Sequence, residues 1–76
     1  MFLDAKKLKA AREAAALTQP ELAKKGGLAF STQVSRYEIT RKGRTKVNPG
    51  TMKRLARALG VPVAALEPDA AEVAQP

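Results

Sequence analysis

The chain has 76 residues, enough for one domain with a small core but not for a catalytic cleft between two lobes. It contains no cysteine and no histidine, which excludes disulfides, most metal sites and most general-base chemistry. Its formal net charge is +7, from 14 lysines and arginines against 7 acidic residues, and this balance favours a polyanionic partner.

No apolar run reaches the roughly 20 residues that span a membrane, and the start of the chain lacks the apolar core of a secretory signal. The sequence also has no phosphate-cradling glycine loop, no nucleophile elbow and no paired acid–base group. We therefore expect a cytoplasmic protein with no membrane partner. We expect no enzymatic activity, no catalytic residues, no cofactor and no metal.

The first third of the chain predicts two short helices. Asp4 can cap a first helix that runs to about Ala16. Thr18 and Glu21 have the spacing of a capping box, in which their side chains bond each other's backbone amides at the start of a second helix. The pair Gly26-Gly27 can end this helix, because glycine readily takes the left-handed conformation.

A third helix is predicted from about Thr32 to Ile39, capped by Ser31 or Thr32 and anchored in the core by Val34 and Tyr37. Its other side chains are polar, which is typical of the second helix of a helix-turn-helix motif.

Phe30 lies just before this third helix. We expect its ring to fill the core or to pack as a staple against Val34 or Tyr37. Contact with a thymine methyl group is the alternative, since phenylalanine is one of the side chains that make it.

The stretch between Glu38 and Val47 is the most basic of the chain, and we expect an extended loop there. Asn48 and Pro49 then predict the start of a fourth helix, since asparagine caps helices and proline suits their first position. Gly60 should end it.

A short fifth helix is expected to begin at Pro62. From Glu67 onward the composition becomes rich in proline and alanine and has no periodicity. These patterns predict one domain at residues 1–67 and a flexible C-terminal tail at residues 68–76.

Five segments resemble the Cro/lambda-repressor type of helix-turn-helix protein, also called the XRE family: Leu8–Arg12, Leu17–Ala23, Gly27-Leu28, Val34–Glu38 and Leu55–Val61. The resemblance implies an all-α fold, a compact five-helix lambda-repressor-like DNA-binding domain. It also implies a protein of bacterial or phage type that associates with the nucleoid. One departure is Ala16, which stands where the family usually has the glycine that ends the first helix.

The resemblance also implies roles for individual residues. The polar side chains of the third helix that would contact bases are Ser31, Thr32, Gln33 and Arg36. The resemblance supports Ser31, Thr32 and Arg36 best, because Gln33 directly precedes Val34, and a phosphate is the alternative partner of Arg36. DNA phosphates would be contacted by Gln19, Ser35, Arg41, Lys42, Arg44 and Lys46. Arg12 and Glu38 would form a structural ion pair. Helix packing is an equal alternative for Ser35, and a solvated loop is the alternative for the four basic residues.

These features predict a transcriptional regulator that binds double-stranded DNA sequence-specifically, and more specifically a repressor. We expect it to bind a palindromic operator as a homodimer, because one recognition helix makes too few base contacts for useful specificity. The first alternative is the antitoxin of a toxin–antitoxin pair, which binds a toxin protein and autoregulates its operon. The second is a protein-interaction module that no longer reads DNA.

Overall fold

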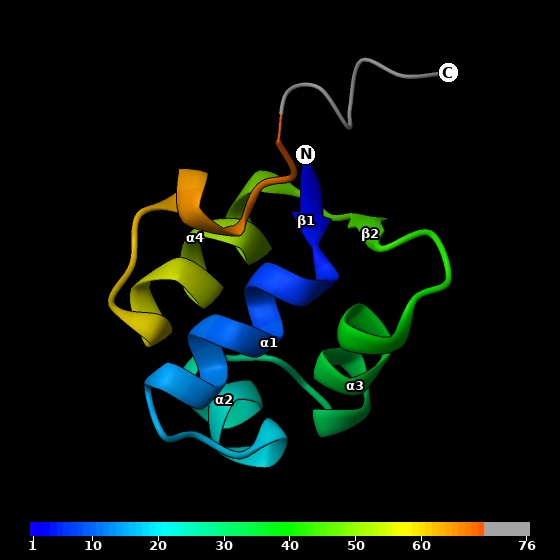
Figure 1. Cartoon of the computed structure of the whole chain (residues 1–76). Coiled ribbons are helices and arrows are strands. Elements are labelled where there is room, and N and C mark those ends of the chain that lie inside the picture. Colours follow the sequence, from blue (N-terminus) through cyan, green and yellow to red (C-terminus); the bar gives the residue numbers. More distant parts are fainter. Residues whose placement is uncertain (70–76) are drawn as a thin grey trace.

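The computed structural model describes residues 1–69, which are mostly helical (Figure 1). In chain order these residues form β1 (Phe2–Asp4), α1 (Ala5–Ala14), α2 (Gln19–Lys25), α3 (Ser31–Ile39), β2 (Arg44–Lys46), α4 (Pro49–Leu59) and the 3-10 helix η1 (Val63–Leu66). Most of the predicted tail, residues 70–76, lies outside the described part of the chain.

The fold departs in two ways from an all-α domain of five helices. In place of a fifth α-helix, residues 63–66 form the single 3-10 turn of η1. Pro68 explains this, because the residue before a proline is pushed out of the helical region, and Glu67 is extended at φ −84° and ψ 145°. The second departure is an antiparallel ribbon, in which Leu3 of β1 lies opposite Thr45 of β2.

The predicted caps form at the start of three helices. The Asp4 carboxylate accepts the Lys7 amide at 2.9 Å in α1. In α2 the capping box is complete, with Glu21 N–H donating to Thr18 Oγ1 at 3.2 Å and Thr18 N–H donating to Glu21 Oε1 at 2.8 Å. In α4 the cap is Asn48, as predicted, and its side chain accepts the Thr51 amide at 2.8 Å.

The start of α3 differs from the prediction that Ser31 or Thr32 caps it. Phe30 occupies the cap position, and no side chain bonds the free amides there. The prediction that Phe30 fills the core is wrong as well, because this residue is 68% exposed. Leu28 packs against the core instead, and within α3 the buried anchor is Val34.

The core lies between the four α-helices and β1 (Figure 1). Its fully buried large side chains are Leu3, Leu8, Leu22, Val34, Met52, Leu55 and Leu66. Burying a side chain of this size stabilises a fold by about 1.5–3 kcal/mol relative to leaving it exposed. The apolar face of α4 supplies the largest share, so this helix is the support on which α2 and η1 are packed.

Three helices end in the same hydrogen-bonding pattern, and one of them uses an unfavourable residue for it. Gly27 and Gly60 take the left-handed conformation after α2 and α4, both with φ 70°. After α1 the same conformation is taken by Ala16, with φ 57°. The amides of Ala16 and Leu17 bond back to Glu13 and Arg12, which is the Schellman arrangement. An L-residue with a Cβ atom is strained in this conformation.

We expect Ala16→Gly to stabilise the domain by about 1 kcal/mol, which corresponds to a rise in melting temperature of roughly 4–8 °C. The reason is that glycine relieves the left-handed strain at φ 57°. Thermal denaturation followed by circular dichroism measures the shift. Ala15→Gly is the matched control: Ala15 is also exposed but has a right-handed backbone, so glycine there should lower the melting temperature. Equal effects of the two changes would contradict the argument.

Candidate nucleic-acid interface

Helix α3 packs against α2 and α1 and presents one side to solvent. On an ideal helix, residues 32, 35, 36 and 39 fall within an arc of about 100°. Thr32, Arg36 and Ile39 are exposed and Ser35 is half-buried, whereas Val34 on the opposite side is buried. We call the surface formed by Thr32, Ser35, Arg36 and Ile39 the outward face of α3.

The four residues predicted to contact bases are not equally placed on α3. Thr32 and Arg36 lie on the outward face, and Ser31 and Gln33 are half-buried at its two margins. Oε1 of Gln33 is buried and has no hydrogen-bond partner among the described residues. An unsatisfied buried acceptor costs about 1–3 kcal/mol. Gln33 therefore has an amide whose bonding capacity is not used inside the domain.

A network around Glu38 holds the C-terminal end of α3. Arg12 and Glu38, the pair that the resemblance implies, form a two-pronged ion pair, with Nε to Oε2 at 2.7 Å and Nη2 to Oε1 at 3.1 Å. The two side chains are only 13% and 2% exposed. The hydrogen bonds that Arg12 donates to Glu38 raise the pKa of the Arg12 guanidinium above its usual value. Arg12 Nη1 also donates to the Leu17 carbonyl at 2.8 Å.

Gln19 belongs to the same network. Its Nε2 donates to Glu38 Oε1 at 3.1 Å, from the first residue of α2. Sequence reasoning assigned Gln19 to a DNA phosphate and did not foresee this bond. The contact fixes the start of α2 against the end of α3. The end of α2 and the start of α3 are connected by the backbone of residues 26–30, so the two helices of the motif are held together at both ends.

The basic segment, residues 41–46, follows α3 and leads along one edge of the molecule to the ribbon (Figure 1). It is not the extended loop that was expected, because half of it is strand β2. Its backbone is held on both sides: Ala5 N–H donates to the Gly43 carbonyl and Val47 N–H to the Met1 carbonyl, both at 2.8 Å. The weak alternation of Thr45 and Val47 with charged residues was the only sequence signal for this strand.

The cations of the basic segment differ in their surroundings. Arg41, Lys42 and Lys46 are exposed. The guanidinium of Arg44 lies 5.5 Å from the centre of the Phe2 ring, a distance at which cation–π attraction operates. Most of the charge of this segment therefore faces solvent on a backbone whose position is fixed by the ribbon.

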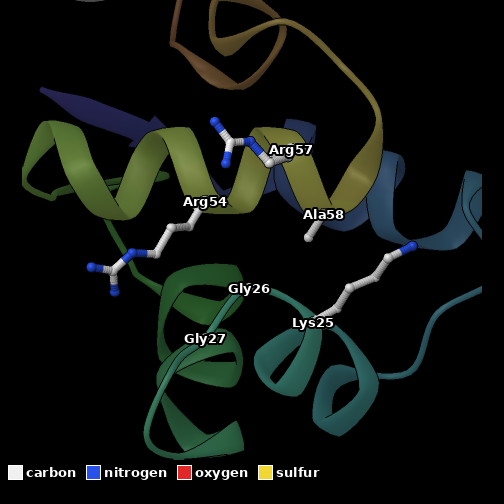
Figure 2. Close-up of a pocket in the computed structure, with 6 residues that line it drawn as sticks. All are labelled: Lys25, Gly26, Gly27, Arg54, Arg57 and Ala58. Carbon is white, nitrogen blue, oxygen red and sulfur yellow. The ribbon is translucent and has the colours of Figure 1, made fainter.

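A further basic surface lies where α2 and α4 meet. A hollow of about 340 Å³ is lined there by Lys25, Gly26, Gly27, Arg54, Arg57 and Ala58. Figure 2 shows that the side chains of Lys25, Arg54 and Arg57 extend in different directions and do not converge on one point. They add positive potential to this side of the domain, but they do not form a binding site for a single anion.

Within residues 1–69, no helix is long enough and apolar enough to cross a bilayer. The same residues contain no group of three or more acidic side chains placed to hold a metal ion.

One comparison with known proteins gives a match. A family model described as a helix-turn-helix domain matches residues 5–68, from the start of α1 to just beyond η1. No curated protein and no solved structure matches the chain.

We expect Arg12→Ala to lower the free energy of unfolding by on the order of 3 kcal/mol, because the buried Glu38 carboxylate would lose its charged partner. Urea denaturation measures the change. Asp69→Asn is the control, since Asp69 pairs with Lys7 at 2.8 Å but is 70% exposed, and such pairs contribute at most about 1 kcal/mol. Similar small effects of both changes would show that the Arg12–Glu38 pair is not structurally important.

Proposed function

Because the chain belongs to the helix-turn-helix family found in XRE-like DNA-binding proteins, we propose that it represses transcription by binding a palindromic operator as a homodimer. The observation that carries the proposal is the outward face of α3, polar except for Ile39, which the Arg12–Glu38 pair holds beside a basic segment. A recognition helix in this setting lies in the major groove, where each base pair shows a distinct pattern of donors and acceptors.

Direct reading of bases is assigned to Ser31, Thr32, Gln33 and Arg36. Arg36 is exposed and can donate two bonds to O6 and N7 of guanine. Gln33 can bond N6 and N7 of adenine, and this would satisfy the amide oxygen that has no partner in the free domain. Thr32 lies one helical turn from Arg36 on the same face and would meet the neighbouring base pair.

The phosphates are assigned to Gln19, Ser35, Arg41, Lys42, Arg44 and Lys46. Such contacts set the position of the protein on the duplex without specifying sequence. The exposed cations of the basic segment follow α3 directly, so they would lie on the strand that borders the groove. Gln19 would contact the backbone from the start of α2 by donating the second N–H of its amide nitrogen to a phosphate, while the first N–H bonds Glu38.

Dimerisation is proposed from the length of the recognition helix. The nine residues of α3 span about 13 Å, which is roughly four base pairs and too few for useful specificity. A two-fold dimer would place two such helices in successive major grooves about 34 Å apart. Occupation of an operator can exclude polymerase by itself, so repression needs no surface beyond the DNA-binding face. Such a protein would work in the cytoplasm of a bacterium, at the nucleoid.

If the protein is an antitoxin instead, it needs a surface that binds a toxin protein. A toxin needs an apolar area, and the most exposed large apolar side chains of residues 1–69 are Phe30 and Ile39, at the two ends of α3. A toxin bound there would compete with DNA for the same helix. Away from α3, the exposed large apolar side chains of residues 1–69 are Met1 and Phe2, and the Phe2 ring is partly covered by the guanidinium of Arg44.

Selection of duplexes from a random library by the purified protein, at near-physiological salt, tests the proposal. We expect an enriched inverted repeat with half-sites about one helical turn apart. A single enriched half-site would retain DNA reading but remove the dimer. If no sequence is enriched and all duplexes bind alike, with an affinity that falls as salt rises, sequence-specific regulation is refuted and a protein partner is favoured.

Arg36→Ala and Lys42→Ala should weaken binding to the selected duplex in different ways. Arg36→Ala is expected to cost about 1–3 kcal/mol and to relax specificity at one base pair. Lys42→Ala should weaken all duplexes equally and reduce the slope of log K against log salt by about 0.9. Lys9→Ala, the same change of charge on α1, is the control and should leave the slope unchanged. Fluorescence anisotropy across a salt series measures all three.

A further inference from the structure

We propose that Phe30 reads the 5-methyl group of a thymine in the operator, as an apolar contact at the front of the recognition helix. This inference rests on the proposed function and adds a specificity residue to it. The observation behind it is that Phe30, a large apolar side chain, is 68% exposed and makes no capping bond at the start of α3. Its ring therefore supports neither the core nor the helix.

The start of α3 is uncapped, unlike the start of the other three α-helices. Asp4, Thr18 and Asn48 each accept a backbone amide at the start of α1, α2 and α4. At the same position before α3, Phe30 has an extended backbone with φ −138° and ψ 140° and makes no such bond. This is the conformation that suits serine, threonine, aspartate or asparagine as a cap. The protein therefore gives up helix stability at the helix that is proposed to read the bases.

The position of Phe30 matches the contact. In a helix-turn-helix protein the N-terminal residues of the recognition helix meet the base edges. Phe30 directly precedes Ser31 and Thr32, two of the residues assigned to bases. In the major groove the apolar feature of a base pair is the thymine methyl group, and phenylalanine is among the side chains that contact it.

The charge of the surroundings favours DNA over an apolar protein as the partner of this ring. Between residues 24 and 57 the chain carries ten lysines and arginines, and in that span the acidic residue is Glu38, whose carboxylate is engaged by Arg12. A protein that docked on Phe30 would have to accommodate this excess of positive side chains. The phosphates on either side of a major groove supply the compensation.

The experiment compares thymine with uracil, which differs only by the 5-methyl group. Each thymine in the half-site of the selected duplex is replaced by uracil, one position at a time, and affinity is measured by anisotropy. We expect the wild-type protein to lose affinity by roughly threefold to tenfold at one position near the N-terminus of α3. Phe30→Ser should show less than twofold dependence on that methyl group, and Phe30→Leu should keep part of it.

Two further measurements separate this role from a structural one. Phe30→Ser should raise the melting temperature by roughly 4–8 °C while it weakens binding, because serine caps the helix. Ile39→Ser removes an equally exposed apolar side chain about 13 Å along the helix and should retain the methyl dependence at the Phe30 position.

Each outcome decides a different point. If the wild-type protein binds its selected duplex specifically but tolerates uracil at every position, the proposal for Phe30 is overturned and the proposed function stands. If no duplex is selected at all, the proposed function fails and the proposal for Phe30 fails with it. If Phe30→Ser is less stable than the wild type, the ring has a structural role, and the inference from the missing cap is wrong.

Discussion

The ion pair between Arg12 and Glu38 is the constraint on which the motif depends. It joins the last turn of α1 to the last turn of α3, and Gln19 adds the first residue of α2 to the same carboxylate. Arg12 also bonds the Leu17 carbonyl, so the turn between α1 and α2 is held by the same side chain. Because Glu38 is only 2% exposed, these bonds must all be made for the carboxylate to be buried at acceptable cost. The orientation of α3 follows from them.

The ribbon extends this rigidity to the basic segment. The strand pairing of Phe2–Asp4 with Arg44–Lys46 and backbone hydrogen bonds on either side of it connect residues 1–5 to residues 43–47, and Leu3 of β1 is buried in the core. A loop with this density of positive charge repels itself and would be mobile without such support. Pairing with the start of the chain fixes the cations at a defined distance from α3. A fixed array loses less conformational entropy when it meets a second, equally fixed array of phosphates.

Two local features reduce the stability of the domain, and only one of them has a proposed functional explanation. The left-handed Ala16 strains the end of α1, and no contact in the structure explains why glycine is absent. The uncapped, exposed Phe30 directly precedes α3, where the proposed contact with DNA would give an apolar ring a role. Departures from local rules are often found at functional sites, because binding rather than folding selects the residue there.

The sequence by itself determined the starts of α1, α2 and α4 and the ends of α2 and α4, because caps and stops are local. Asp4, Thr18 with Glu21, Asn48 with Pro49, and Gly60 act within a few residues of their own positions, and each does in the structure what its spacing predicts. The resemblance of Val34–Glu38 to a known motif likewise led to the family and to the Arg12–Glu38 pair.

Only the tertiary structure decided the rest. The pairing of Phe2–Asp4 with Arg44–Lys46 joins segments about forty residues apart, and a three-residue strand leaves almost no periodicity to read. The bond from Gln19 to Glu38 and the exposure of Phe30 depend on how α2, α3 and the turn between them pack. Burial is a property of the assembled core rather than of a residue type: Leu28 packs against the core here, whereas the larger Phe30 is exposed.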